Sequence, residues 1–418
     1  MAADLGAAAG HESARRVAVV GAGYAGLAAA VTLARRGVRV TVFESGPVPG
    51  GRARRVTTGG HTLDNGQHIL VGAYTALLGL MREVGADPDA LLLRIPLELR
   101  YAQGFRLRTP GLPAPLHLAV GLFTATGLPW RERFAAVAFM QAMRAKRFRV
   151  EAHVSVSTLL EAHSQAGMIG RFLWFPLCIS ALNTLPQQAS ANAFLAVLRD
   201  SLAGARAASE LLSPRVDLTK LFPEPAAAWL AARGGEVRTG SPVRDLAALR
   251  REFDRIIVAV GPHQLEPLIP GLASAYTYQP IYTIYLKYPS SVRLPLAMLG
   301  LSEGVVQWVF DRGQLEGDAG LLACVISAQG DHQQMSQDEL AATCHRELST
   351  ALGKLPKPEW TQVIAEKRAT VTCVPEIPRF GPDTALPGVF LAGDYTDPEY
   401  PPTLEAAALS GIRAAERI

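Results

Sequence analysis

Apolar positions at the start of the chain form two short β-branched runs separated by a longer Ala-rich stretch. Residues 17–20 are an apolar run of strand type, and glycines at the spacing G-x-G-x-x-G follow at once. Residues 24–36 are rich in Ala and Leu, contain no Pro and stop before Gly37, as a helix does. Residues 38–43 are a second β-branched strand. The pattern predicts a complete β-α-β unit of roughly 30 residues.

The same kind of pattern returns after a long helical region. From about residue 74 to residue 215 the chain predicts long helices interrupted by Pro and Gly, and strand signals are sparse. Residues 221–233 then predict a helix, and strands are expected at residues 236–239, 242–246 and 254–260. This passage leads the chain back to the sheet of the first unit.

A second excursion covers about residues 264–361. Three β-rich runs, at residues 282–288, 305–310 and 321–328, predict an antiparallel sheet that forms the floor of a pocket. A helix is expected at residues 338–352, because Ser336 and Glu339 have the spacing of a capping box. A strand at residues 388–394 and a helix that opens near Thr403 close the pattern.

These elements predict an α/β fold, in which a Rossmann-type dinucleotide-binding domain carries an inserted α+β substrate domain. The first domain is discontinuous and comprises residues 16–75, 211–263 and 362–418. The substrate domain comprises residues 76–210 and 264–361. Residues 1–15 lack the apolar segment of a signal peptide and are expected to be a disordered tail, so the expected location is the cytoplasm.

Composition restricts the classes of partner. Hydrophobic residues make up 49% of the chain and the mean hydropathy is +0.16, which suits an apolar substrate or a membrane-facing surface. The net charge of +4 is modest and no basic run is interleaved with aromatics, so nucleic acid is not an expected partner. The cysteines are scattered without a C-x-x-C pair, so neither a metal site nor a disulfide framework is predicted. They are Cys178, Cys324, Cys344 and Cys373.

One stretch could contact a membrane. Residues 112–130 are apolar, but Pro113, Pro115 and Pro129 interrupt them, so they do not predict a transmembrane helix. Apolar residues beside the basic residues that follow suit a helix lying on an anionic membrane face, and an ordinary solvated face over a buried helix is the alternative. The basic residues are Arg131, Arg133, Arg144, Lys146, Arg147 and Arg149.

The glycine motif supplies the first candidate site. Gly21 permits a tight turn, Gly23 lets the backbone approach a pyrophosphate, and Gly26 lets the helix pack closely on the strand. The N-terminus of that helix offers free N–H groups and a positive dipole. Glu44 lies about 20 residues downstream, where an acid accepts hydrogen bonds from a ribose 2′-hydroxyl and repels a 2′-phosphate. These residues predict a dinucleotide other than NADP and leave FAD and NAD as alternatives.

Two further segments carry a resemblance to a known superfamily. Pro49-Gly50-Gly51-Arg52 follows the ribose acid, and a strand ending in Gly393-Asp394 precedes the last helix. With the first motif, these segments resemble the flavoprotein superfamily of amine oxidases and phytoene desaturases, which favours FAD. The segments DNGQH, FLWFPLCISALNT, LFPEPAAAWL and EKRATV resemble, more narrowly, the squalene-associated FAD-dependent hydroxysqualene dehydroxylases of bacteria.

The resemblance implies which residues hold FAD. Asp394 would accept hydrogen bonds from ribityl hydroxyls, and the helix N-terminus at Thr403 would stabilise negative charge on the reduced flavin. The segment from Asp64 to Gly66 would bring backbone against the isoalloxazine ring, and Val243 on its expected strand would contact the adenine. The implied cofactor contacts are Gly21, Gly23, Tyr24, Ala25, Gly26, Glu44, Gly50, Gly51, Arg52, Gly66, Gln67, His68, Val243, Gly393, Asp394, Thr403 and Leu404.

The resemblance also implies a reaction. Hydroxysqualene would lose its hydroxyl as water while a reduced flavin supplies hydride, giving squalene for hopanoid synthesis. A proton donor must reach the leaving oxygen in a dry, apolar pocket, and the candidates are His68, Asp64, Tyr400 and Asp397. His68 could instead shape the flavin edge, and Asp64 could be a turn residue.

The implied partners are a hydrophobic isoprenoid and the cytoplasmic face of the inner membrane, where association would be peripheral. The single dinucleotide motif does not identify an external electron donor. Two other functions stay open: a carotenoid-type desaturase that runs the flavin chemistry oxidatively, and a non-catalytic prenyl-binding escort protein, which intact flavin motifs disfavour. Amine oxidases carry a lysine on the first strand of the pocket sheet, whereas Lys287 lies toward the end of the expected strand, so amine oxidation is disfavoured.

Overall fold

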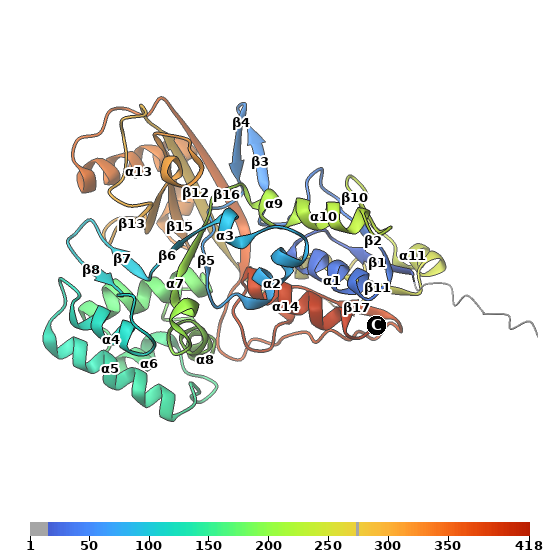
Figure 1. Cartoon of the computed structure of the whole chain (residues 1–418), viewed down its shortest axis with the longest axis horizontal. Helices are drawn as coiled ribbons and strands as arrows, with labels where there is room; N and C mark the ends of the chain where they lie inside the picture. Colours follow the sequence, from blue (N-terminus) through green and yellow to red (C-terminus); the bar gives the residue numbers. More distant parts are fainter. Residues whose placement is uncertain (1–15, 273–275) are drawn as a thin grey trace, which may run out of the picture.

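The computed structural model of the chain describes residues 16–272 and 276–418. The tail expected at residues 1–15 lies outside the described residues. Figure 1 shows two parts side by side: a sheet flanked by α1, α10 and α14, and a second sheet that lies next to a group of helices. The predicted α/β class is confirmed.

The first sheet is entirely parallel and contains the predicted β-α-β unit. Its strand order is β10-β2-β1-β11-β17, and β1 lies at the centre. Val17 and Val19 of β1 pack under α1, whereas Ala18 and Val20 pack on the opposite face with α11. The elements are β1 (Arg16–Val20), α1 (Tyr24–Arg35), β2 (Arg39–Phe43), α10 (Pro223–Ala231), β10 (Glu236–Arg238), α11 (Leu246–Glu252), β11 (Arg255–Val258), β17 (Val389–Leu391) and α14 (Leu404–Ala415).

One predicted strand of this part is wrong. Residues 242–245 have no regular structure, and a helix begins at Leu246 where the strand was expected to end. Asp245 caps that helix by accepting a hydrogen bond from the Ala247 N–H at 2.7 Å. Val243 therefore lies in an irregular segment, where it is half-buried and packs on the same cluster as Phe43.

The second sheet is antiparallel, as expected, and has the order β13-β14-β15-β12-β16. One face of it packs on α13, through residues such as Leu340 and Leu348. The predicted boundary at residue 362 is corrected here, because residues 362–371 pair with β12 and belong to this sheet. The elements are β12 (Tyr278–Lys287), β13 (Met298–Gly300), β14 (Trp308–Asp311), β15 (Leu321–Ser327), α13 (Gln337–Leu352) and β16 (Trp360–Val371).

The remaining elements connect the two sheets or form the helical group on the left of Figure 1. The hairpin β3 (Arg55–Thr58) and β4 (His61–Asp64) leads into the DNGQH segment. The others are β5 (Leu70–Val71), α2 (Thr75–Glu83), α3 (Pro88–Leu91), β6 (Leu92–Ile95), β7 (Glu98–Arg100), β8 (Arg106–Arg108), α4 (Leu116–Phe123), α5 (Trp130–Ala145), α6 (Val156–Ala162), η1 (Gly170–Trp174), α7 (Phe175–Leu182), α8 (Ala191–Val197), η2 (Leu198–Leu202), η3 (Arg206–Ser209), β9 (Leu211–Pro214), α9 (Leu218–Leu221), η4 (Pro262–Gln264), α12 (Arg312–Glu316), η5 (Asp331–Gln334) and η6 (Asp394–Thr396).

Helices α1 and α14, which flank the parallel sheet, pack backbone to backbone. α14 lies against α1, and a Cβ atom added at Gly411 would lie 2.2 Å from the Ala25 carbonyl oxygen. Any side chain at this position must push the two helices apart. By contrast, a Cβ atom added at Gly79 of α2 meets no described atom within 4 Å.

We therefore expect Gly411→Ala to destabilise the fold by about 1–3 kcal/mol through overpacking. Gly79→Ala is the matched control and should leave stability unchanged or raise it by up to about 1 kcal/mol, because Ala favours the helix over Gly. Thermal and urea unfolding followed by circular dichroism measure both changes. Equal stabilities for the two variants would contradict the close contact.

Candidate active site

The first glycine turn is closed so tightly that only glycine fits it. Gly21 has a φ of +105°, its N–H donates to the Phe43 carbonyl at 2.7 Å, and an added Cβ would lie 2.6 Å from the Ala259 carbonyl oxygen. An added Cβ at Gly26 would lie 2.0 Å from the Gly21 carbonyl oxygen. The turn thus brings α1 directly onto β1 and leaves the N-terminus of α1 open toward a phosphate.

The predicted ribose acid is held at the end of β2. One Glu44 oxygen accepts a hydrogen bond from the Ala22 N–H at 2.8 Å, and the other accepts from the Gly46 N–H at 2.7 Å. The oxygen bonded to Gly46 also accepts from the Ser45 hydroxyl at 3.3 Å, so the oxygen bonded to Ala22 is the one with a lone pair left for a ligand hydroxyl. Glu44 is therefore oriented by the backbone before a ligand arrives.

The second glycine turn lies directly on the first. The Gly50 N–H donates to the Ala22 carbonyl at 2.8 Å, and an added Cβ at Gly51 would lie 3.2 Å from the Gly23 Cα. Gly50 and Gly51 both have positive φ angles, of +123° and +62°. Glycine is required here by backbone conformation and by close approach together.

Arg52 joins the second turn to the opposite end of the chain. Its Nη2 donates to Asp394 Oδ2 at 2.7 Å and its Nη1 donates to the Ala369 carbonyl at 2.7 Å. The Arg52 carbonyl accepts from Asn65 Nδ2 at 3.0 Å, and the same amide group donates to Glu366 at 3.0 Å. The motifs that sequence analysis singled out far apart therefore meet at one place.

The C-terminal motif leaves an acceptor free at this place. Asp394 Oδ1 is buried and has no hydrogen-bond partner among the residues that the structure describes. Thr403 caps α14 by accepting from the Ala406 N–H at 3.1 Å, and Leu404 begins the helix. A buried carboxylate oxygen without a donor suits a ligand that brings hydroxyl groups, as a ribityl chain does. The residues present thus fit FAD.

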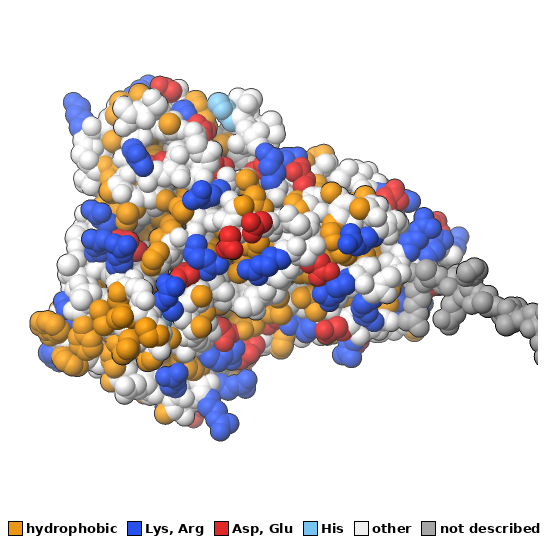
Figure 2. All heavy atoms as spheres, in the orientation of Figure 1, with side chains coloured by type: hydrophobic (Ala, Val, Ile, Leu, Met, Phe, Trp, Pro, Cys, Tyr) orange, Lys and Arg blue, Asp and Glu red, His pale blue; other side chains and the backbone are white. Residues whose placement is uncertain are grey.

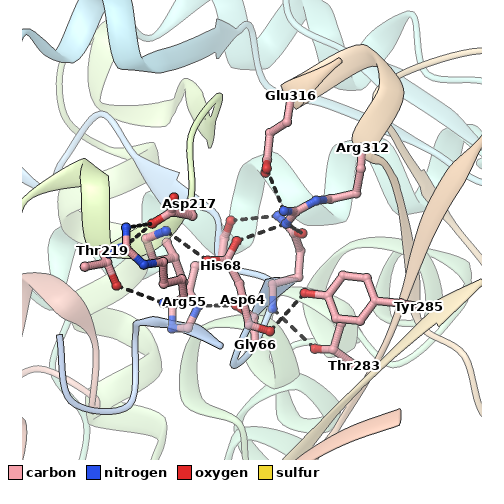
Figure 3. A network of polar contacts seen from close by, with 12 residues as sticks. Arg55, Asp64, Gly66, His68, Asp217, Thr219, Thr283, Tyr285, Arg312 and Glu316 are labelled. Atoms are coloured by element: carbon pink, nitrogen blue, oxygen red, sulfur yellow. Dashed lines mark hydrogen bonds and ion pairs between the residues drawn. The ribbon is translucent and has the colours of Figure 1, made fainter. Parts of the chain in front are cut away.

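The DNGQH segment is clamped by the second sheet (Figure 3). Asp64 is 2% exposed; its Oδ1 accepts from the Leu218 N–H at 2.9 Å and its Oδ2 accepts from Arg312 Nη1 at 2.9 Å. The Tyr285 hydroxyl donates to the Asp64 carbonyl at 3.0 Å. Asp64, the last residue of β4, is therefore fully engaged in holding the segment in place.

Gln67 is held by the same sheet. Its N–H donates to the Thr283 hydroxyl at 3.3 Å, and its side-chain oxygen accepts from Arg312 Nη1 at 3.2 Å. Arg312 is 2% exposed and its Nη2 donates to Glu316 at 2.6 Å. One buried guanidinium thus donates to two carboxylates and to the Gln67 side-chain amide.

The shared cation sets the ionisation of its partners. Burial raises the pKa of Asp64, although Arg312 opposes this increase. Burial also raises the pKa of Glu316 to about 7; Arg312 opposes this increase, and the negative charge of the nearby Asp64 adds to it.

His68 holds a defined proton. Its Nδ1 lies 2.8 Å from the Gly66 carbonyl oxygen, which can only accept, so Nδ1 carries the proton. Burial lowers the pKa of His68, and Arg52 lowers it further. The neutral ring therefore presents Nε2 as an acceptor and fixes the carbonyl of Gly66.

The other two donor candidates are engaged elsewhere. The Tyr400 hydroxyl donates to Asp200 of η2, and burial followed by this contact raises the pKa of Tyr400 to about 12. Asp397 is 1% exposed and accepts from Arg413 at 2.7 Å as well as from the Glu399 and Tyr400 N–H groups. Both residues shape the loop before α14.

Comparison with known proteins agrees with this geometry. A sequence profile described as flavin containing amine oxidoreductase matches residues 24–418. The chain belongs to this family. It is an FAD-dependent oxidoreductase. The glycine turns, Glu44, Arg52 and Asp394, called the cradle below, are the residues predicted to hold that cofactor.

Several relatives match over nearly the full length. A hydroxysqualene dehydroxylase of Rhodopseudomonas palustris is 30% identical, with 97% of this chain and 98% of the relative covered. One from Sinorhizobium fredii is 27% identical, with 96% and 98% covered. A probable zeta-carotene desaturase of Synechococcus elongatus is 23% identical, with 96% and 98% covered.

The fold agrees with solved structures as well. The crystal structure of an oxidoreductase from Methanosarcina mazei has a TM-score of 0.72 at 17% identity, with 96% of this chain and all of that chain covered.

Sequence analysis missed the residues of the second sheet that hold the DNGQH segment. Thr283, Tyr285 and Arg312 lie more than two hundred positions from their partners at residues 64–67. Arg312 directly follows β14 in a polar sequence, and no local pattern marks it as buried.

We expect Arg312→Met to destabilise the protein by about 3–5 kcal/mol, because it leaves Asp64 buried without its cation. Arg35→Met is the control: Arg35 is exposed and pairs with Glu83 on the surface, where an ion pair is worth about 0–1 kcal/mol. Urea unfolding measures both, and flavin absorbance per protein reports cofactor retention. Similar losses in both variants would show that Arg312 is not a clamp.

A pH dependence follows from Glu316. The pKa of Glu316 is higher in the folded than in the unfolded chain. The contribution of Glu316 to the stability of the fold is therefore highest at low pH, where Glu316 is protonated in both states, and it falls as the pH rises through about 7. Glu316→Gln removes the titration, so the stability of the variant relative to the native chain should be higher at about pH 8 than at about pH 5. Melting temperatures at the two pH values test this. A relative stability independent of pH would contradict it.

Proposed function

We propose that this enzyme removes the hydroxyl group of hydroxysqualene reductively and gives squalene, for hopanoid synthesis. The observation that carries the proposal is the full-length match to hydroxysqualene dehydroxylases, and it is supported by a DNGQH segment that is hydrogen-bonded to Arg52 and to Arg312. A hydrophobic isoprenoid is accordingly the substrate class.

In this reaction the carbon–oxygen bond breaks, the hydroxyl leaves as water after taking a proton, and the carbon receives a hydride. FAD, when bound and reduced, supplies that hydride. The chain supplies position: Arg52, Asn65 and Asp394 align the two ends of the cradle, and the clamp of Asp64 by Arg312 keeps the segment at residues 64–68 from moving.

The proposed role of His68 is to shape the site and not to protonate the substrate. A neutral ring whose single proton goes to Gly66 offers only an acceptor, Nε2, to a substrate. Asp64, Asp397 and Tyr400 have their polar atoms committed to protein partners, so each would have to leave its partner before it could donate. The arrangement favours a bound water as the source of the proton.

A carotenoid-type desaturase remains the second candidate. The match to a zeta-carotene desaturase favours it, but at lower identity than the match to the dehydroxylases. Oxidative and reductive directions use the same cradle, and an external electron donor is needed for the reductive one.

We place the enzyme in the cytoplasm, peripherally on the inner membrane. The substrate and product proposed above are insoluble in water and reside in lipid. None of the helices in the described part of the chain is long and apolar enough to cross a membrane.

The deciding experiment is anaerobic. The purified enzyme is reduced, hydroxysqualene is added, and the flavin band is followed while the lipid is extracted for mass analysis. We expect reoxidation with one squalene formed per flavin. The dehydroxylase proposal fails if the flavin stays reduced, and bleaching of the oxidised enzyme by phytoene would establish the desaturase instead.

A further inference from the structure

The exposed large hydrophobic side chains gather at one corner of the molecule. Trp130, Phe134 and Leu116 are 62%, 61% and 54% exposed. In the part of the chain that the structure describes, every exposed large hydrophobic residue belongs to this corner or to the loop beside it: Leu112, Leu116, Val120, Trp130, Phe134 and Met168. We call this set the apolar corner. Figure 2 shows it as a continuous orange surface over α4 and α5.

The apolar corner is held rigidly. Arg133 turns inward, and its Nη2 donates to the carbonyls of Ala125 and Leu128 at 2.8 and 2.9 Å. Its guanidinium also lies 4.2 Å from the centre of the Trp130 ring. Arg133 thereby closes the turn between α4 and α5 and fixes Trp130 in its outward position. The exposure of Trp130 is therefore a built feature, whereas the Arg133 guanidinium, one of the basic groups considered for membrane contact, bonds inside the protein.

A contact between two aromatic rings joins α4 to α5 at the apolar corner. Phe123 at the end of α4 lies edge-on to Phe134, with ring centroids 5.2 Å apart. The two helices thus present their apolar residues as one preformed surface, and no ordering of a loop is needed before it can bind.

The charged residues in the segment that carries most of the apolar corner are almost all basic. Residues 112–149 contain a single acid, Glu132, and its carboxylate is used internally to accept from the Ile169 N–H at 2.7 Å. Arg131 is exposed beside Trp130, and Arg144, Lys146 and Arg147 are exposed at the C-terminal end of α5. Because a helix rises about 1.5 Å per residue, the cations at the C-terminal end of α5 lie roughly 20 Å from Trp130 at its N-terminal end.

We infer that the apolar corner docks this enzyme on an anionic lipid surface, an inference that rests on the peripheral location proposed above. Trp130, Phe134 and Leu116 enter the boundary between headgroups and acyl chains, where an indole is favoured. The basic end of α5 contacts lipid phosphates. A second copy of the chain fits less well, because each copy brings the same excess of positive charge.

The test is vesicle flotation of the holoenzyme. The double variant Trp130→Ser with Phe134→Ser is compared with the control variant Trp229→Ser. The control removes a ring of α10 that lies under Arg233, outside the apolar corner. Vesicles of phosphatidylcholine are used with and without phosphatidylglycerol. We expect the double variant to bind anionic vesicles roughly tenfold more weakly or worse, and Trp229→Ser to bind as the native chain does.

Two further readings complete the test. Charge reversal of the far end, Arg144→Glu with Arg147→Glu, should abolish the preference for phosphatidylglycerol. All variants should retain flavin absorbance, and the double variant should keep its turnover of substrate in detergent. Equal vesicle binding by the double variant and the native chain overturns the inference. So does a native dimer that the double variant converts to a monomer without loss of vesicle binding. If docking fails while detergent turnover yields squalene, the proposed reaction still stands.

Discussion

The contacts of Arg52 hold the site together, because they join three segments that are distant in sequence. Its guanidinium reaches Asp394 before α14 and the Ala369 carbonyl in β16, while its own carbonyl takes a hydrogen bond from Asn65. The residue can do this only because Gly50 and Gly51 let its backbone lie on the first glycine turn. Backbone contact and ion pairing thus fix the cradle before any cofactor is bound.

The parts of the fold with short-range patterns could be predicted from the sequence. The β-α-β unit and the capping box of α13 depend on neighbours within a few positions, and both occur as expected. β16 was placed in the wrong part because Glu366, Lys367 and Arg368 are three consecutive charged residues, which interrupt the alternation typical of a strand. At residues 242–246 the apolar pattern was too weak to outweigh a helix cap at Asp245.

The residues of the site likewise differ in whether a local pattern marks them. Gly21, Glu44, Arg52 and Asp394 could be predicted as cofactor contacts because cofactor binding imposes spacings that remain visible in one sequence, and the structure brings the segments that carry them together. The state of Asp64 could not be found that way. Whether a turn acid is free or paired depends on Arg312, a residue 248 positions away whose burial is decided by the second sheet.

The order of strands in the parallel sheet has a consequence for how the protein is made. β17 adds to the sheet beside β11, and α14 packs on α1, yet both come from the last thirty or so residues of the sequence, whereas β1 and α1 come from the first part described. On the ribosome, α1 must therefore wait for its partner while the helical group and the second sheet emerge between them. The face of α1 around Ala25, which Gly411 of α14 finally covers, stays open until α14 has been made, and so a chaperone has access to that face while residues 36–403 are synthesised.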